Sequence, residues 1–270
     1  VGFSNVGPEV AISAPGGNCV NDPPAACLYP ILAATNSGTH GPVSSTYTDS
    51  YNYSVGTSFS APLVSGTIAL MLSQRSSLTQ AQVLAALQST AHAFPAETDS
   101  SIQECHAPNG TIQDQCYCTT STCGAGMLNA AAAVAAATNA IVPIIDVSPA
   151  TPQAASTITL SAANSLVPAG RNIGAVQWTL VSGGGIVSGF ASGASSTTAT
   201  VLPSAAGSFT VQVSVADDQG GTPVLATKTI TVAAAASSSS GGGALSASVL
   251  IVLAALAAVL WASSARRSGM

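Results

Sequence analysis

Charged side chains are scarce in this 270-residue chain, which has 5 Lys and Arg against 10 Asp and Glu. The length allows one or two domains at roughly 100–200 residues each. So few charges argue against an ordinary cytosolic enzyme surface and also against a charge-rich disordered chain. The few basic residues form no patch that could follow phosphates, which excludes a basic nucleic-acid binder. They are Arg75, Arg171, Lys228, Arg266 and Arg267.

Metal-ligand motifs are also missing. The chain has no CxxC pair and no histidine at ligand spacing from a cysteine pair, and Cys116 and Cys118 form only a CxC. Zinc sites normally need such pairs. The acidic residues are scattered and make no DxDxDG calcium loop. No metal site and no cofactor can therefore be identified from motifs.

The cysteines that are present indicate disulfides. Six cysteines, an even number, all lie in the first half of the chain. This pattern is typical of proteins that fold in an oxidising compartment. Six cysteines allow 15 pairings in principle. Loop lengths favour Cys19–Cys27, Cys105–Cys116 and Cys118–Cys123.

No secretory leader is visible at the start, where an initiator Met, a charged segment and an apolar stretch are all absent. We therefore expect a mature form or a fragment. Most of the chain is acidic and has only 3 basic residues, and it is followed by an apolar run and a C-terminal Arg pair. This arrangement predicts a secreted or surface protein. Composition divides the chain into residues 1–141, 142–233, a flexible linker at 234–243 and an apolar segment at 244–270.

The first zone combines strand-like and helical patterns. A strand is expected at Val10–Ser13, before a Pro-Gly turn. Residues 61–72 are apolar nearly all round, which predicts a buried helix. Thr79 and Gln82 form a capping box that opens an amphipathic helix, and an alanine-rich helix ends the zone. The second zone has repeated period-2 runs between turn residues, which indicate a β-sandwich with Trp178 in its core.

The strongest chemical signal is GTSFSAPLVSG at residues 56–66. Gly56 permits a tight turn, and Pro62 suits the first turn of a helix. Ser58 would lie at a helix start, where backbone amides and the helix dipole favour a developing oxyanion. The simpler interpretation is that Ser58 only caps the helix, but the whole run favours a nucleophile.

This run resembles the nucleophile motif of the subtilisin-like serine proteases (subtilases), GTSxAxPxVxG. Gly56, Thr57, Ser58 and Pro62 fall on the pattern, whereas Ser60 stands where Ala is common and Leu63 where His is common. Three flanking segments resemble the family in the same order: FSNVGPEVAISAPG, the capped helix, and CGAGMLNAAAAV. The resemblance covers about residues 1–140.

The resemblance implies a serine endopeptidase acting on protein or peptide substrates, with Ser58 as the catalytic nucleophile. It implies part of a three-layer α/β/α catalytic domain and permits structural calcium, with no site to assign. In the family, the catalytic Asp and His and the oxyanion Asn precede the nucleophile. The matching region begins after them, so we expect this chain alone to be inactive.

None of the residues that could replace a base is favoured. His40 lies only 18 positions before Ser58, in a cysteine-bearing loop. His92 is expected at a helix C-terminus, where histidine usually interacts with the dipole. His106 lies in a loop between cysteines. Asp22 and Asp49 are expected to be solvated turn residues.

The remaining zones resemble accessory modules of exported bacterial proteins. Residues 142–233 resemble a PKD or immunoglobulin-like domain, which favours a spacer or accessory domain; binding of a polymer or matrix is the alternative. Residues 244–262 are uncharged and long enough to span a bilayer once. With the Arg pair and Gly241–Gly243, they resemble the GlyGly-type sorting tails of Gram-negative bacteria, which imply cutting by an intramembrane protease near the glycines; a plain membrane anchor is the alternative.

The sequence therefore predicts a partial α/β catalytic domain, an all-β sandwich and a single C-terminal transmembrane helix. The location expected is the surface or exterior of a Gram-negative bacterium. The rival hypothesis is a non-catalytic surface protein in which a degenerate protease half serves adhesion.

Overall fold

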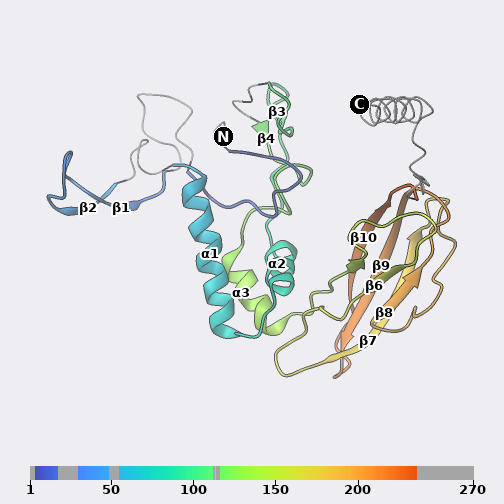
Figure 1. Cartoon of the computed structure of the whole chain (residues 1–270). Coiled ribbons are helices and arrows are strands. Elements are labelled where there is room, and N and C mark those ends of the chain that lie inside the picture. Colours follow the sequence, from blue (N-terminus) through green and yellow to red (C-terminus); the bar gives the residue numbers. More distant parts are fainter. Residues whose placement is uncertain (1–3, 18–29, 49–54, 112, 114–115, 236–270) are drawn as a thin grey trace, which may run out of the picture. The chain divides into compact units, whose positions relative to one another are not determined.

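The computed structural model describes residues 4–17, 30–48, 55–111, 113 and 116–235 (Figure 1). Contacts divide the chain into two units, Val1–Ala234 and Ala235–Met270. Almost all described residues belong to the first unit. The division predicted at residue 141 stays a prediction.

Three helices form the centre of the first zone: α1 (Thr57–Gln74), α2 (Gln80–Ser89) and α3 (Ala130–Asn139). α3 packs against both of the others, and its small side chains allow the close approach. Met71 of α1 and Ala133 of α3 are fully buried where the helices meet. The helices thus share one small hydrophobic core.

The capping box predicted at the start of α2 is confirmed. The Thr79 hydroxyl accepts a hydrogen bond from the Gln82 amide, and the Gln82 side chain accepts one from the Thr79 amide. Each bond satisfies a backbone donor that a helix N-terminus leaves free.

The expectation that α1 is buried is wrong for the described part of the chain. Only Thr67 and Met71 of this helix are buried, although apolar residues surround its axis. Leu63 is 44% exposed and Leu70 is 57% exposed. The buried Met71 belongs to the core shared with α3, while these leucines remain uncovered by the described residues.

The strand predicted at Val10–Ser13 is also wrong. Only Ser13 forms a bridge, parallel to Met127. The Ala125 amide also donates to the Ala11 carbonyl, but the neighbouring segment is a turn, and no described strand runs along residues 10–13. Described strands of this zone form two small pairs and no three-layer sheet. They are β1 (Ala33–Asn36) with β2 (Ser45–Thr48), antiparallel, and β3 (Gln103–Glu104) with β4 (Cys116–Tyr117), parallel.

Residues 146–232 form two antiparallel sheets packed face to face, as the period-2 runs predicted (Figure 1). One sheet has the strand order β5-β6-β8 and the other β10-β9-β7. Their bounds are β5 Asp146–Ser148, β6 Ile158–Ser161, β7 Ile173–Ser182, β8 Thr198–Val201, β9 Gly207–Asp217 and β10 Val224–Val232. Together with the α/β pattern of the first zone, this gives an α/β part followed by an all-β part.

The sandwich core contains the predicted tryptophan. Trp178 and Phe209 are almost fully buried among aliphatic residues of both sheets. The Trp178 indole N–H donates to the Ser196 carbonyl at 2.9 Å, so burial of the ring leaves no polar atom unpaired.

An ion pair fixes one end of the sandwich. The Arg171 guanidinium lies 2.6 Å from a carboxylate oxygen of Asp217, whose side chain is almost fully buried. The backbone amides of Gly221 and Gln219 donate to its other oxygen. The hydrogen bond from Arg171, together with these amides, lowers the pKa of Asp217 below its ordinary value. Asp217 is thus a structural turn residue.

Among the described residues, no helix is long and apolar enough to cross a membrane. The segment predicted to do so, 244–262, lies outside the described residues, as do residues 236–243 of the linker predicted at 234–243.

The lowered pKa of Asp217 predicts how stability depends on pH. Because the folded state favours the ionised carboxylate, Asp217 stabilises the fold above its unfolded pKa of about 3.9. This stabilisation is lost as pH falls through the lower pKa of the folded state. We expect Asp217→Asn to lower the melting temperature at pH 7 by several degrees, and the difference from wild type to shrink progressively below pH 4. Thermal unfolding followed across pH tests this, with the exposed Glu9→Gln as a control. A deficit that stays constant down to the lowest pH contradicts it.

Candidate active site

Ser58 occupies an exposed position in the first turn of α1. Gly56 is the N-cap, and no side chain caps this end of the helix. In the described part of the chain, the Ser58 hydroxyl has no hydrogen-bond partner. The residue is therefore accessible beside free backbone amides of a helix N-terminus, which favour negative charge.

Two glycines bring the helix start against the Pro15–Gly16 turn. The Gly56 amide donates to the Gly16 carbonyl at 2.7 Å. A Cβ at Gly16 would lie 2.7 Å from the Ser60 hydroxyl oxygen and 3.0 Å from the Gly56 carbonyl oxygen. Gly56 itself has φ +137°, a conformation that side chains disfavour. The APG and GTS motifs, 40 residues apart, thus meet because Gly16 leaves room for the contact and Gly56 can adopt the required φ.

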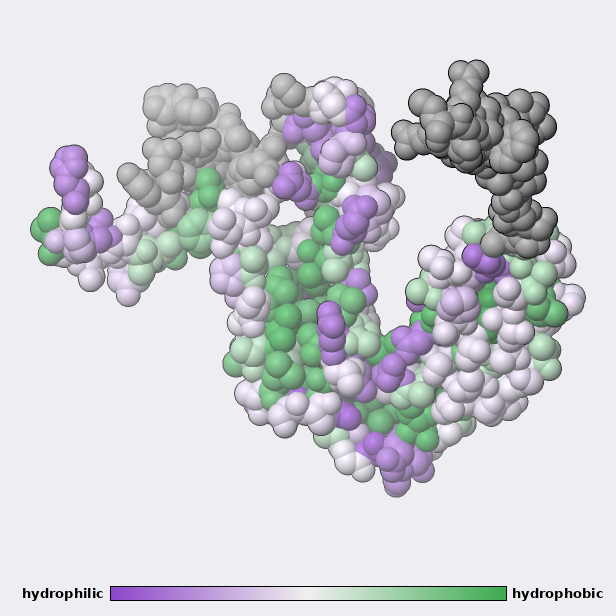
Figure 2. Space-filling view, in the orientation of Figure 1, coloured by the Kyte–Doolittle hydropathy of each residue, from purple (hydrophilic) through white to green (hydrophobic). Residues whose placement is uncertain are grey.

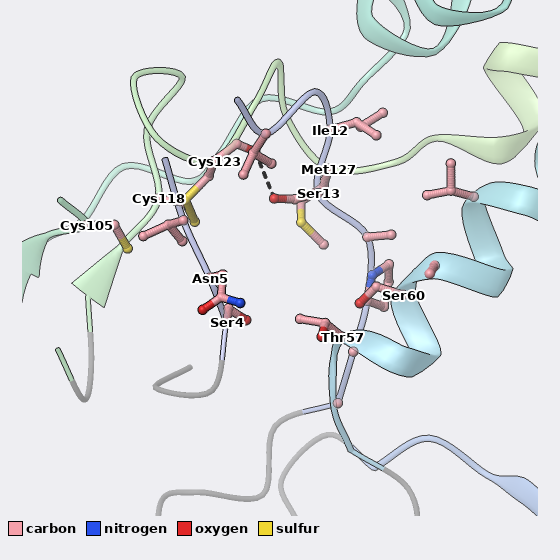
Figure 3. A pocket seen from close by; sticks show the side chains of 18 of the residues that line it. Ser4, Asn5, Ile12, Ser13, Thr57, Ser60, Cys105, Cys118, Cys123 and Met127 are labelled. Carbon is pink, nitrogen blue, oxygen red and sulfur yellow. Dashed lines mark hydrogen bonds between the residues drawn. A yellow bond between two sulfur atoms is a disulfide. The ribbon is translucent and has the colours of Figure 1, made fainter. Parts of the chain in front are cut away.

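A cavity of about 600 Å³ lies beside this junction (Figure 3). Helix α1 contributes Thr57, Ser60, Ala61 and Val64, which form one stripe at helical spacing. Ser58 lies on the neighbouring face of the helix and does not line the cavity. The predicted motif residues Gly56 and Pro62 do not line it either, so only Thr57 of the four predicted residues does.

The opposite side of the cavity comes from the N-terminal segment and the cysteine-rich loop. Figure 3 shows Ser4 and Asn5 across the cavity from Thr57 and Ser60. Ser13 lies on another side of the cavity, next to Met127, and donates a hydrogen bond to the Cys123 carbonyl at 2.9 Å (Figure 3). In the sequence, Ser4 and Asn5 stand out only within FSN, part of a segment that resembles a family motif, and no pattern assigns them to a site.

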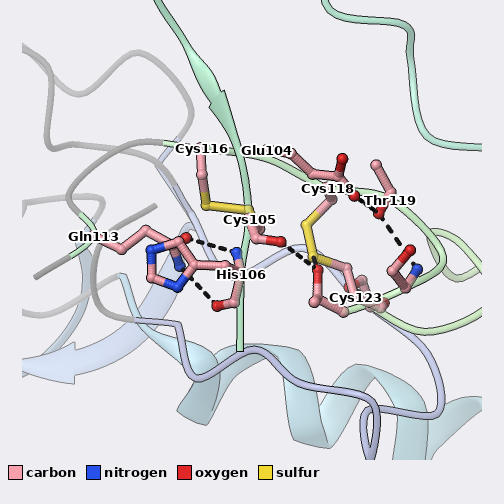
Figure 4. The surroundings of a disulfide bond; sticks show 11 residues. Glu104, Cys105, His106, Gln113, Cys116, Cys118, Thr119 and Cys123 are labelled. Carbon is pink, nitrogen blue, oxygen red and sulfur yellow. Dashed lines mark hydrogen bonds between the residues drawn. A yellow bond between two sulfur atoms is a disulfide. The ribbon is translucent and has the colours of Figure 1, made fainter. Parts of the chain in front are cut away.

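Two disulfides form the wall behind this segment (Figure 4). They are Cys105–Cys116 and Cys118–Cys123, the same pairs that loop length favoured. The third predicted pair, Cys19–Cys27, lies outside the described residues. The sulfurs of Cys105, Cys118 and Cys123 lie within 4.8 Å of one another, but each is already bonded in a disulfide and offers no thiolate to a metal.

The cysteine-rich loop also holds the N-terminal segment through backbone contacts. Gly7 donates to the Thr122 carbonyl at 2.8 Å, and Ala125 donates to the Ala11 carbonyl at 3.1 Å. Gly124 has φ +78°, and a Cβ there would lie 2.6 Å from the backbone of Ala11 and Ile12. The CGAG turn therefore needs glycine both for its conformation and for this close approach.

None of the three histidines lines the cavity. His40 is exposed in the β1–β2 hairpin. The expected place of His92 at a helix C-terminus is wrong: α2 ends at Ser89, and the His92 backbone pairs with Met127 instead. The His106 ring contacts the Ala107 carbonyl through Nδ1 at 2.9 Å. The two predicted turn residues Asp22 and Asp49 lie outside the described residues.

Apolar surface surrounds the site. Figure 2 shows hydrophobic residues gathered over the helices. From α1, they include Leu63, Leu70 and Leu72, all exposed. Isolated exposed leucines are common, but several on one helix that is apolar all round indicate a surface suited to packing against further protein.

Comparisons with known proteins give matches to proteases. The model of the subtilase family matches residues 1–115. An extracellular protease of Xanthomonas campestris is 36% identical over 138 residues, which are 51% of this chain and 17% of that protein. The chain thus spans about a sixth of the length of this curated relative. These matches support a protease at the family level.

Solved structures match about a third of the chain. One is a carbohydrate-binding module of the β-sandwich superfamily, with 26% identity over 36% of each chain and a TM-score of 0.29. Another is a PKD domain from Vibrio anguillarum, with 18% identity over 36% of this chain and 99% of that one, and a TM-score of 0.27. At such TM-scores, neither likeness implies a ligand for this chain.

The close approach of Gly124 predicts a specific mutational cost. We expect Gly124→Ala to lower the free energy of unfolding by about 1–3 kcal/mol more than Gly110→Ala, because only the former forces a Cβ into another backbone. Both glycines have φ near +80°, and Gly110 has open space around its Cα. Urea unfolding of the two variants measures the difference. Equal losses would show that backbone conformation alone demands glycine at Gly124.

Proposed function

We propose that Ser58 is the nucleophile of a secreted serine endopeptidase, of which this chain forms part. The observation that carries the proposal is the place of Ser58 within GTSFSAPLVSG: an exposed hydroxyl in the uncapped first turn of α1. The family match over residues 1–115 and the extracellular protease relative support it.

The chemistry follows from the helix start. The Ser58 hydroxyl oxygen attacks the scissile carbonyl carbon, while a general base takes its proton. Negative charge develops on the carbonyl oxygen, where the Ser58 amide and the helix dipole stabilise it. The amine product leaves with a proton from the base, and water then hydrolyses the acyl-enzyme. The cleaved substrates are proteins or peptides.

The base, its orienting carboxylate and the oxyanion Asn come from other parts of the complete catalytic domain. Among the described residues, no histidine lines the cavity next to Ser58. The exposed leucines of α1 offer a surface against which the remaining layers of that domain would pack, which would bury this helix as its composition predicts. Completion of the sheet would also give the segment at Val10–Ser13 a strand with which to pair.

The absence of a histidine from the cavity wall also favours a second candidate, a non-catalytic surface protein that retains the protease part for adhesion. The two hypotheses differ in the reactivity of Ser58. An activated serine reacts with fluorophosphonates, whereas an inert one does not.

Removal of the Ser58 hydroxyl tests the catalytic proposal in the longer protein. We expect Ser58→Ala to abolish fluorophosphonate labelling and to lower peptide hydrolysis on the order of a millionfold, as when the serine of subtilisin is removed. The exposed Ser73→Ala, on the same helix, serves as a control with full activity. We expect the 270-residue chain alone to remain unlabelled because it lacks the base. Undiminished peptide hydrolysis by the Ser58→Ala variant contradicts the proposal.

We also propose that the C-terminal segment directs export. Its support is the uncharged run at 244–262 before Arg266 and Arg267; the extracellular relative supports secretion. In this account, the segment inserts in the membrane and an intramembrane protease cuts near Gly241–Gly243.

Intact-mass analysis of secreted protein tests whether the C-terminal tail is cleaved. We expect the secreted form to end near Gly243, with substitution of Gly241–Gly243 by valine keeping the protein on the membrane. Secreted material that retains Met270 contradicts cleavage, and cell-bound material with an intact tail identifies a plain anchor instead.

A further inference from the structure

The loop between β6 and β7 of the sandwich contributes to the hydrophobic core of the helices. Leu166 in this loop is fully buried, and it belongs to the cluster that contains Met71 and Ala137 rather than to the sandwich core. Val142, at the start of the sandwich zone, belongs to the same cluster. A side chain from the all-β part thus fills a position among the helices.

Hydrogen bonds hold this loop at three places. Leu166 and Val142 exchange both backbone hydrogen bonds, each at 2.9 Å. The Ile144 amide donates to the Ser165 hydroxyl at 3.0 Å. The Ala169 amide donates to the Thr138 carbonyl in the last turn of α3 at 2.8 Å, which satisfies a carbonyl that a helix C-terminus leaves free.

The C-terminal end of α1 is tied to the same loop. Arg75 is the C-cap of α1, and its guanidinium donates to the Val167 carbonyl at 2.7 Å. A cation at this end of the helix also interacts favourably with the helix dipole. Since Ser58 lies near the other end of α1, the loop holds one end of the helix that carries the candidate nucleophile.

A spacer on a flexible linker would show none of these contacts. We propose that the sandwich is a structural brace: by inserting Leu166 and the surrounding loop, it stabilises the packing of α1 against α3, and the two parts unfold together. Adhesion or spacing needs no such coupling. The inference does not depend on whether Ser58 is catalytic.

Amide hydrogen exchange in the 270-residue chain tests the coupling. The decisive variant is Ile158→Val in the sandwich core, because Ile158 is fully buried and has no part in the helical cluster. If the sandwich braces the helices, this distant change raises the slowest exchange rates in α1 and α3 by the same factor as those in β9, about two- to tenfold. The proposal is wrong if exchange rates in β9 rise while those in α1 and α3 stay at their wild-type values.

A second variant removes the inserted side chain itself. We expect Leu166→Ala to raise exchange in α1 and α3 by more than about tenfold, as is usual for loss of a buried leucine. Leu202→Ala, an identical change at an exposed position of the sandwich, is the matched control and should leave the helices unaffected. If Leu166→Ala prevents folding, the exchange rates of Ile158→Val still test whether the two parts unfold together. Helices that exchange no faster in Leu166→Ala than in Leu202→Ala contradict a role for this loop.

Discussion

The packing of α1 against α3 is the contact on which both the site and its support depend. Helix α1 is apolar on every side, yet among the described residues only the face that meets the alanines of α3 is covered. That contact fixes the axis of α1, and with it the position of Ser58 at one end and Arg75 at the other. Hydrophobic burial is the dominant favourable term in folding, so a helix with one covered face is incompletely stabilised.

The two ends of α1 are held in different ways. At the N-terminus, contact with the Pro15–Gly16 turn needs glycine at two positions. A Cβ at Gly16 would crowd the Gly56 carbonyl, and Gly56 itself has a positive φ. At the C-terminus, a charged side chain reaches the β6–β7 loop, and Leu166 of that loop enters the helical core. The first contact shapes the surroundings of Ser58, and the second connects α1 to the sandwich. Disulfides stiffen the remaining wall of the cavity.

Local signals in the sequence predicted local structure well. The capping box at Thr79 and the strands around Trp178 depend on neighbours a few residues away, and the structure has both. The burial of α1 and the strand at Val10–Ser13 were wrong because each depends on tertiary neighbours. Among the described residues, nothing covers the exposed leucines of α1, and a turn rather than a strand lies beside Val10–Ser13. The insertion of Leu166 was missed for a related reason: a leucine in a short loop carries no periodicity, so nothing in the pattern assigns it to a core. The position of Ser58 at a helix start was predicted from its motif. The cavity beside it could not be predicted, because it is formed by tertiary contacts.

Tandem mass spectrometry of the longer secreted protein after fluorophosphonate treatment tests the central claim most directly. The account predicts a single covalent adduct, on the hydroxyl oxygen of Ser58 and on no other serine. Because the reagent reacts only where a base activates the hydroxyl, such an adduct would place a base beside the first turn of α1. An adduct on a different serine, or no adduct in a protein that is folded and cleaves peptides, contradicts the account.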